Sequence, residues 1–460
     1  MFRIRRSPGS LTTRDLQSIH SDLKQVNAAV ARAYPGERPD RQPIHTVYGG
    51  AHLFRANSAQ RLGALALAAL DEYAPDAPSL AQALHWGKDD GCPADLAATV
   101  RARIVTKLRN EPVEDFRLDF EDGYGVRSDD EEDGHAQSAA QEVAAGLRAA
   151  TLPPFIGIRI KPLSQELHGR SLRTLDLFVT TLVRETKKRL PPNFVITVPK
   201  LMAAGQVAAV AEACASLEKR LGMRNGTLRL ELMIETPQSI LAPDGSTILR
   251  SLLAAGEGRV TGAHFGTYDY TALCGITASF QHMRHATCDF AKHMMQVALA
   301  QSGVHLSDGA TNIMPIAPHR PAPDRPLTED QRRENRETVH RAWRIHFDDV
   351  RHSLVNGFYQ GWDLHPAQLP TRYAAVYSFF LSARPAATAR LRNFVEKAAQ
   401  ATLVGDVFDD AATGQGLLNF FVRGMTSGAL TIDEARETGL GVDELQGRSF
   451  VKVIENRRRG

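Results

Sequence analysis

Short apolar segments alternate with longer helical segments along most of this 460-residue chain, and this alternation restricts the fold more than any other feature. The short segments are rich in β-branched residues and end in polar, Gly or Pro residues, which is typical of strands. The longer segments carry apolar residues at three- and four-residue spacing, which is the helical period. The predicted strands are 44–52, 115–122, 155–162, 194–201, 228–236, 259–267, 312–317 and 357–363, and the main predicted helices are 59–73, 134–150, 171–189, 205–221 and 289–301.

Strands that alternate with helices predict a parallel sheet, because parallel neighbours need crossover connections. We expect an α/β fold in which eight strands close into a (β/α)8 TIM barrel. Acidic residues stand at the ends of several strands, where barrel enzymes keep their chemistry. An open doubly wound sheet would need a Gly-rich phosphate turn, and the sequence contains neither G-x-G-x-x-G nor G-x-x-x-x-G-K-[ST].

Some segments fall outside this alternation. The predicted parts are a helical lead-in at 1–40, the barrel at 41–375 and a helical C-terminal extension at 376–460 with helices at 386–401 and 432–445. The barrel carries an insertion at about 74–109. The segment 315–328 contains five prolines, so it cannot be a continuous helix or central strand, and we expect a lid, a surface loop or a spacer there.

Composition narrows the class of partner and the compartment. The net charge of +3 comes with scattered basic residues and no basic stripe interleaved with aromatic residues, so nucleic acid is not an expected partner. No apolar run approaches the length of a membrane span, and residues 1–14 lack a secretory signal. The four cysteines form no C-x-x-C pair, which argues against a disulfide framework and a zinc ribbon. We therefore expect a cytoplasmic protein.

Two acids follow neighbouring predicted strands, in E-L-M-I-E-T-P and H-F-G-T-Y-D-Y-T. An acid at the end of an apolar strand is costly unless it is solvated, paired or bound to metal. On adjacent barrel strands, Glu235 and Asp269 would lie close enough to hold one cation. Ligation by oxygen alone suits Mg²⁺, which takes one or two carboxylates and keeps several waters. Pairing of either acid with an arginine is the alternative.

A second acidic group ends the second strand, in L-D-F-E-D-G-Y-G. Asp119 and Glu121 are two residues apart and so face one side of a strand, whereas Asp122 faces the other. Such a group repels itself unless a cation or an arginine lies nearby, so the pair is expected to support metal-bound water or to orient an arginine. The acidic run 129–133 is expected to form the solvated first turn of the next helix.

Basic residues follow the third and fourth strands. Arg159 and Lys161 alternate with isoleucines in I-G-I-R-I-K-P-L, so both face one side, which is either the barrel interior or an outer salt bridge. An inward arginine offers a planar fork to a carboxylate. Lys200, in I-T-V-P-K-L, either balances the acids or ends its strand.

Other candidates are weaker. Thr267 and Tyr268 adjoin Asp269 and are expected to contact substrate or the metal's neighbours. His52 and His264 fall where they could reach the barrel mouth. His282 and His285 lack the glutamate of an H-E-x-x-H site, and no G-x-S-x-G nucleophile elbow occurs.

Taken in order, these motifs resemble the citrate lyase β-subunit family, the aldolase/citrate lyase group that is related to malyl-CoA lyases and malate synthase. The family has D-x-E-D, R-x-N, P-K, I-E-[ST]-P and G-x-x-D-Y at successive strand ends. The matching segments here are Asp119–Asp122, Arg159–Lys161, Pro199–Lys200, Ile234–Pro237 and Gly266–Tyr270, and the closing strand with His365–Gln368 resembles the family's N-P-x-Q.

The resemblance implies a barrel of the pyruvate/phosphoenolpyruvate-binding type with Glu235 and Asp269 as Mg²⁺ ligands. It also implies that Arg159 grips the substrate carboxylate and that Asp119 and Glu121 line the side of the metal-bound water. Three positions depart from the family. Tyr268 replaces an acid, Lys161 replaces the asparagine of R-x-N, and His365 replaces the asparagine of N-P-x-Q.

We therefore expect a homo-oligomeric, Mg²⁺-dependent carbon–carbon lyase of the aldolase type. Its substrate would be a small keto acid or related carboxylate, either free or as a coenzyme A ester. The general base stays open among Asp119, Glu121, His52 and a residue of the C-terminal extension or of another subunit. Phosphoenolpyruvate-dependent phosphotransfer and a non-catalytic binding barrel are the alternatives.

Overall fold

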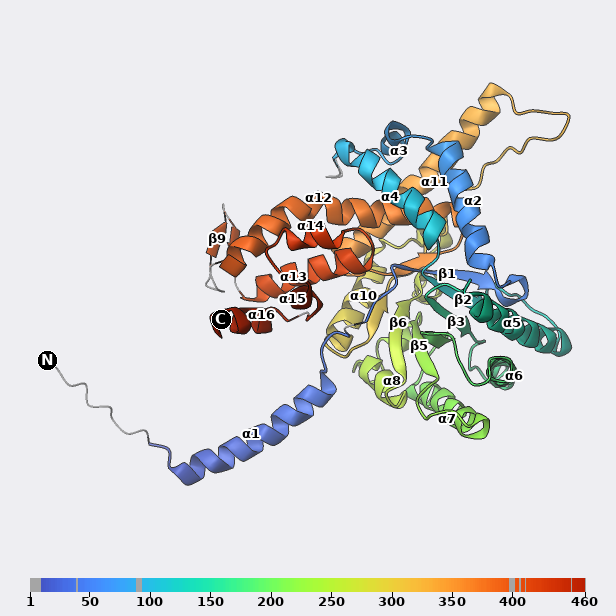
Figure 1. The fold of residues 1–460 in the computed structure, drawn as a ribbon. Coiled ribbons are helices and arrows are strands. Elements are labelled where there is room, and N and C mark those ends of the chain that lie inside the picture. Colours follow the sequence, from blue (N-terminus) through green and yellow to red (C-terminus); the bar gives the residue numbers. More distant parts are fainter. Residues whose placement is uncertain are drawn as a thin grey trace.

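The computed structural model describes residues 10–38, 40–87, 93–396, 402–404, 407–409, 411–447 and 449–459. In this part of the chain, eight parallel strands form one sheet in the order β7-β6-β5-β4-β3-β2-β1-β8, with helices around it (Figure 1). The strands are β1 His45–Gly50, β2 Asp115–Asp119, β3 Phe155–Arg159, β4 Phe194–Val198, β5 Arg229–Ile234, β6 Val260–Phe265, β7 His305–Ser307 and β8 Gly361–Asp363.

The sheet closes into a barrel between β7 and β8. The amide of Asp308 donates to the carbonyl of Gln360 at 2.8 Å, and the amide of Trp362 donates to the carbonyl of Gly309 at 2.9 Å. A parallel bridge joins Ala310 to Trp362 just beyond these bonds. Closure satisfies the backbone groups that an open edge would leave unpaired, and it confirms the predicted (β/α)8 barrel.

Helices cover the barrel in the predicted alternation. The helices that follow β1 to β8 in turn are α2 Ser58–Tyr73, α5 Asp129–Ala149, α6 His168–Glu185, α7 Ala204–Leu221, α8 Leu249–Ala255, α9 Thr267–Leu273 with α10 Ala286–Leu299, α11 Glu329–Val355 and α12 Leu369–Glu396. Ser128 caps α5, and the acidic run forms its first turn, as predicted. Within that turn Glu132 is buried and pairs with Lys161 at 3.0 Å, so the run is only partly solvated.

Two predicted elements are wrong. The predicted strand at 312–317 is irregular chain, and the seventh strand is the shorter, more polar β7 at His305–Ser307, which carries too little apolar pattern to detect. The predicted helix at 432–445 is two helices, α14 Ile432–Arg436 and α15 Val442–Gln446, because the chain turns at Gly439, whose φ is +81°.

The barrel core is polar at the level of its middle layer. Arg117 donates to Glu231 at 2.9 Å and also to Asp115, and Thr197 donates to Glu231 at 2.7 Å. His264 shares a 2.6 Å hydrogen bond with Glu231. All of these side chains are buried. A buried polar network of this kind is stable only when its members satisfy one another, and it fixes the register of the strands that carry them.

The insertion and the C-terminal part pack on one side of the barrel. The insertion forms α3 Ala77–Ala83 and α4 Ala97–Asn110, and α4 packs against α12. Beyond α12 come β9 Thr402–Val404, β10 Val407–Asp409, α13 Ala411–Thr426, α14, α15 and α16 Phe450–Arg459. The helix predicted at 386–401 is the second half of α12 as far as Glu396, and residues 397–401 lie outside the described residues.

The remaining segments lie apart from the barrel. The Pro-rich segment 315–328 contains no helix and no barrel strand, and it loops away from the body before α11 (Figure 1). The N-terminal helix α1, Thr13–Ala33, also projects from the body. None of the helices described is long and apolar enough to cross a membrane. Cys214, Cys274 and Cys288 are free thiols, and Cys92 lies outside the described residues.

A buried acid ties the closing strand to three other elements. Asp363 on β8 accepts from His45 of β1 at 2.8 Å and from His346 of α11 at 2.9 Å, and Arg372 of α12 donates to it at 2.9 Å. Asp363 and Arg372 are both buried, and their pairing holds the pKa of Asp363 far below its usual range in spite of burial.

Replacing Asp363 with alanine should destabilise the fold by about 3–5 kcal/mol, because Arg372 would keep a buried charge without its partner. The control is Asp433→Ala, which removes an exposed acid that pairs with Arg436 and should cost less than about 1 kcal/mol. Urea unfolding at neutral pH measures both. Equal free energies of unfolding for the two variants would contradict the role given to Asp363.

Candidate functional site

A cavity of about 430 Å³ opens at the carboxyl ends of the barrel strands. Its lining residues come from the ends of β1, β2, β3, β5, β6 and β8 and from the loop after β7. The charged residues that line it are Asp119, Asp122, Arg159, Glu235 and Asp269. This is the end of a TIM barrel where side chains from different strands converge, so the cavity is the candidate active site.

Glu235 and Asp269 face this cavity from neighbouring strands. Glu235 directly follows β5 and is 1% exposed, whereas Asp269 lies in the first turn of α9, after β6. Gly266 makes room for the glutamate, since a Cβ at that position would lie 2.5 Å from Glu235 Oε2. The ends of β5 and β6 therefore bring the two acids to one cavity, as predicted.

The surroundings of Glu235 disfavour its charge. Burial, together with the neighbouring charge of Asp269, raises the pKa of Glu235 to about 8, although Arg159 and Lys200 act in the opposite direction. The backbone amide of Lys200 donates to Glu235 Oε1 at 2.7 Å. The positive charges of Arg159 and Lys200 therefore do not fully compensate the negative charge of Glu235 and Asp269.

Lys200 links the acids around the cavity. Its φ of +49° lies in the left-handed region, which is unusual for a residue other than glycine and aims its amide at Glu235. Its ammonium contacts Glu121, lies 3.0 Å from Asp122 and lies 3.5 Å from Asp269. Burial lowers the pKa of Lys200, but Glu121, Glu235 and Asp269 together raise it by more, so the side chain stays charged.

Arg159 is held in a fixed orientation by Asp119. Its Nε donates to Asp119 Oδ1 at 2.7 Å and its Nη2 donates to Oδ2 at 2.6 Å, while Nη1 lies 2.9 Å from Glu121. The amides of Glu121 and Gly123 also donate to Asp119, at 3.0 and 2.7 Å. Four donors therefore fill the acceptor sites of this carboxylate, and the carboxylate in turn orients the arginine.

Two aromatic residues that no sequence motif marked pack against Arg159. Tyr48 of β1 and Trp362 of β8 stack with ring centroids 4.4 Å apart, and the guanidinium lies 4.9 Å from the Tyr48 ring. Trp362 donates to His264 Nδ1 at 2.6 Å, so His264 presents its other ring nitrogen to Glu231. The order of the barrel strands brings β1 and β8 together, and no local motif marks these two residues.

Three further predicted residues differ in their position relative to the cavity. Lys161 lies outside the cavity, where it donates to the carbonyl of Phe120 at 2.6 Å and pairs with Glu132 of α5. Tyr268 lines the cavity, but its hydroxyl donates to the carbonyl of Ala310 and accepts from the amide of Asn312. Thr267 also lines the cavity, and its buried hydroxyl has no hydrogen-bond partner among the residues described.

The histidines do not converge on the cavity. His52 packs beside Tyr124 and His135, and burial lowers its pKa, so it is largely neutral at neutral pH. His365 accepts from the amide of Ala367 and caps a short helical turn. His285 caps α10 in the same way, and the described residues contain no cluster of three or more potential metal ligands of the His, Cys, Asp or Glu types.

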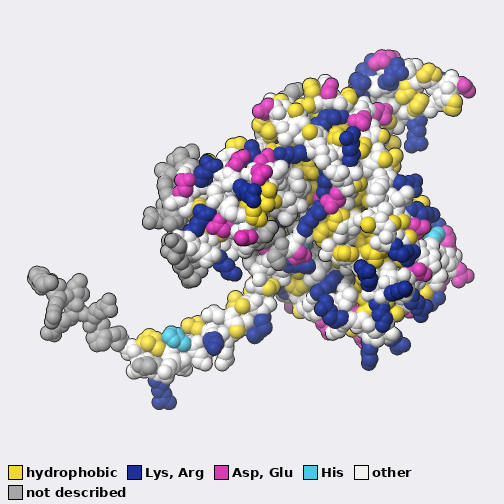
Figure 2. Space-filling model, viewed as in Figure 1, with side chains coloured by type: hydrophobic (Ala, Val, Ile, Leu, Met, Phe, Trp, Pro, Cys, Tyr) yellow, Lys and Arg dark blue, Asp and Glu magenta, His cyan; other side chains and the backbone are white. Residues whose placement is uncertain are grey.

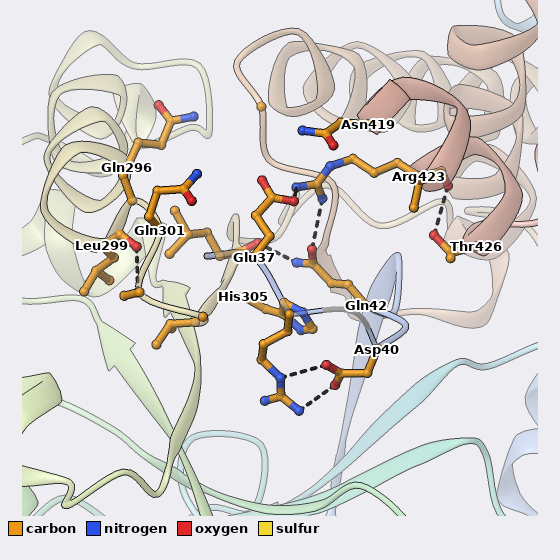
Figure 3. Close-up of a pocket in the computed structure, with 18 residues that line it drawn as sticks. Glu37, Asp40, Gln42, Gln296, Leu299, Gln301, His305, Asn419, Arg423 and Thr426 are labelled. Atoms are coloured by element: carbon orange, nitrogen blue, oxygen red, sulfur yellow. Dashed lines mark hydrogen bonds and ion pairs between the residues drawn. The ribbon is translucent and has the colours of Figure 1, made fainter. Parts of the chain in front are cut away.

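A second cavity, of about 180 Å³, lies at the opposite end of the barrel (Figure 3). It lies where the chain after α1 meets the start of β7 and helix α13. Its charged groups already have partners, since Arg38 pairs with Asp40 and Arg423 with Glu37. Because barrel enzymes place their chemistry at the other end, this cavity is interpreted as a seam between the barrel and the C-terminal helices.

The raised pKa of Glu235 predicts a specific dependence of stability on pH. A carboxyl whose folded-state pKa lies above its unfolded value stabilises the fold at low pH, and this contribution is lost as the pH rises toward 8. In chelator, the free energy of unfolding of the wild type should fall relative to Glu235→Gln by on the order of 4 kcal/mol between pH 5 and pH 8.5. Parallel pH profiles for the two proteins would show that the carboxyl is not perturbed.

One solved structure is similar to this chain in fold, and one protein family is similar to it in sequence. A citrate lyase from Burkholderia xenovorans LB400 aligns with a TM-score of 0.54 and 16% identity over 88% of this chain and 100% of the other. A malate synthase from Haloferax volcanii, in a magnesium and glyoxylate complex, aligns with a TM-score of 0.43 and 14% identity over 91% of this chain and 97% of the other. A search of curated proteins found no match.

The citrate lyase likeness extends over 88% of this chain and supports a shared fold. A family model described as "Domain of unknown function (DUF6986)" matches residues 23–453. The chain belongs to the DUF6986 family.

Proposed function

We propose that this protein is a Mg²⁺-dependent enzyme that breaks or forms a carbon–carbon bond in a small keto acid or related carboxylate. One observation carries the proposal: Glu235 and Asp269 share a single cavity with Arg159 at the carboxyl ends of the barrel strands. The ordered motifs that resemble the citrate lyase β-subunit family support it, and so does the barrel shared with a citrate lyase.

The cavity suits a divalent cation bound by oxygen. Two carboxylates on adjacent strand ends supply the protein ligands that Mg²⁺ takes, and the cavity has room for water or substrate oxygens. The raised pKa of Glu235 indicates a buried carboxyl that lacks compensating positive charge. Glu235 must lose its proton to bind a cation, so metal binding would release a proton and tighten with rising pH up to about 8.

Residues of the chain would bind and orient the substrate. Arg159 keeps N–H groups on Nη1 and Nη2 beyond those given to Asp119 and Glu121, and it lines the cavity. We infer that these groups bind the substrate carboxylate, while Asp119 acts as a positioning residue. Mg²⁺, when bound, would supply Lewis acidity toward the oxygens of the keto acid. The unpaired hydroxyl of Thr267 is a further candidate contact.

Coenzyme A esters and free keto acids remain the two forms of substrate to test. A panel of pyruvate, glyoxylate, oxaloacetate, phosphoenolpyruvate and acyl-CoA esters covers the chemical classes. A ligand raises the melting temperature only when it prefers the folded form, so a shift that requires Mg²⁺ identifies the class. Product analysis by NMR then shows whether a carbon–carbon bond changes. Release of phosphate from phosphoenolpyruvate would replace the proposal by phosphotransfer, and binding without turnover would replace it by a binding barrel.

Removing either acid should abolish the metal site. Glu235→Ala and Asp269→Ala should each weaken Mg²⁺ binding by at least about 100-fold, because a Mg²⁺ site with two protein carboxylates loses half its protein ligands. The Mg²⁺-dependent thermal shift with keto acids should disappear as well. The control is Asp244→Asn, which changes an exposed acid that accepts hydrogen bonds from Ser246. Isothermal titration that shows unchanged Mg²⁺ affinity in either alanine variant would refute the metal assignment.

Arg159→Lys tests the carboxylate site separately from the metal. A lysine cannot reproduce the fork that meets Asp119 and a substrate carboxylate together, so keto-acid affinity should fall by about 10- to 100-fold. Mg²⁺ affinity measured without substrate should change by less than about threefold. Arg173→Lys, at an exposed site on α6, should change neither affinity. Wild-type keto-acid affinity in Arg159→Lys would exclude this arginine as the carboxylate ligand.

A further inference from the structure

Helix α1 projects from the body (Figures 1 and 2), and each of its described side chains is exposed to solvent. It carries apolar residues that are 38–57% exposed along its length, and they are Leu16, Ile19, Leu23, Val26 and Val30. Helices of globular proteins gain most of their stability by burying an apolar face. A 21-residue helix with its apolar face in solvent therefore lacks the contact that would stabilise it.

The spacing of these residues indicates what covers them. Successive positions are separated by three, four, three and four residues, and Ala33 continues the series. This is the a and d pattern of a heptad repeat, with Leu16, Leu23 and Val30 at a. A strict a/d stripe is the narrow seam of a coiled coil, whereas a helix that packs on a globular core has a wider apolar face.

Within the described part of the chain, the contacts between this helix and the body lie at its C-terminal end. The amide of Gly36 donates to the carbonyl of Gln301 at 3.0 Å, and Arg250 lies 4.6 Å from the ring of Tyr34. Glu37 pairs with Arg423 at 3.3 Å, beside the cavity at the base of the barrel (Figure 3). These contacts fix the base of α1 and leave its apolar stripe free along the length of the helix.

The polar residues that flank the stripe favour a second copy as the partner. In this heptad Asp15 and Asp22 occupy g, and His20 and Asn27 occupy e. In a parallel pair g faces e of the other helix, so Asp15 meets His20 and Asp22 meets Asn27, and each acid faces a hydrogen-bond donor. In an antiparallel pair g faces g, and the acids lose these donors.

A membrane surface is a poorer partner for this helix. Helices that bind membranes have a polar face rich in Lys and Arg and often carry Trp or Phe on the apolar face. The polar face of α1 mixes Asp15 and Asp22 with Lys24 and Arg32, and its apolar stripe contains no aromatic residue.

We propose that α1 is a self-association helix, which packs in parallel through its a and d residues against α1 of a second copy of this chain. Leucine at two of the three a positions, with Ile19 and Val26 at d, also fits bundles of more than two helices, so further copies can join by the same contact. The proposal concerns assembly and is independent of the proposed enzymatic function.

Multi-angle light scattering of the full chain across protein concentration tests the contact. The wild type should have at least twice the monomer mass of 50.4 kDa. Leu23→Asp with Val26→Asp, which places charges at a and d, should weaken association by at least about 100-fold. Ser21→Asp with Ala28→Asp places the same charges at outer f positions and should keep the wild-type mass. A monomeric wild type, or equal masses for the two double variants, would overturn the proposal.

Crosslinking tests orientation even if the body has other interfaces. In a parallel pair identical positions of the seam meet, so Val30→Cys should form a disulfide between chains under mild oxidation. Ala28→Cys, on the outer face of the same helix, should not, and the wild type reports any background from its native cysteines. Crosslinking of both variants to the same extent, or of neither, would contradict parallel packing of α1.

Discussion

The charge balance around Glu235 governs the mouth of this barrel. A carboxyl buried at the end of β5 beside Asp269 cannot ionise freely, and the two nearest cations are already engaged by other acids. Arg159 is tied to Asp119 and Glu121, and the ammonium of Lys200 lies among Glu121, Asp122 and Asp269. An additional cation would relieve this excess of negative charge, which gives the proposed metal a physical reason to bind at this point.

The scaffold explains why the arrangement is rigid. Asp119 receives four hydrogen bonds, so the loop after β2 and the guanidinium of Arg159 hold each other in place. The rings of Tyr48 and Trp362 pack against the guanidinium. His264 hydrogen-bonds both Trp362 and Glu231, and so connects this pair to the buried polar layer of the barrel. The site therefore rests on side chains from most of the strands, as expected when catalytic geometry must be preorganised.

The sequence pattern predicted the elements and site residues that depend on short stretches of chain. It did not predict the features that depend on contacts between residues far apart in the sequence. The first six strands and the residues at their ends followed from apolar runs that end in polar residues. Strand β7 was not predicted because three residues are too few to show a periodic pattern. Lys161 was expected on the same side as Arg159, but β3 ends at Arg159, and side chains beyond it no longer alternate between the two faces of the sheet. Trp362 and Tyr48 meet only because the barrel closes, so the sequence offered no signal for them.

Anomalous scattering from Mn²⁺, a common substitute for Mg²⁺, tests the central claim most directly. Crystals grown with Mn²⁺ and a keto acid should show one strong anomalous peak in the cavity at the mouth of the barrel. It should lie within about 2.3 Å of oxygens of both Glu235 and Asp269. An empty cavity, or a peak that contacts neither carboxylate, would contradict the account of this barrel as a metal-dependent enzyme.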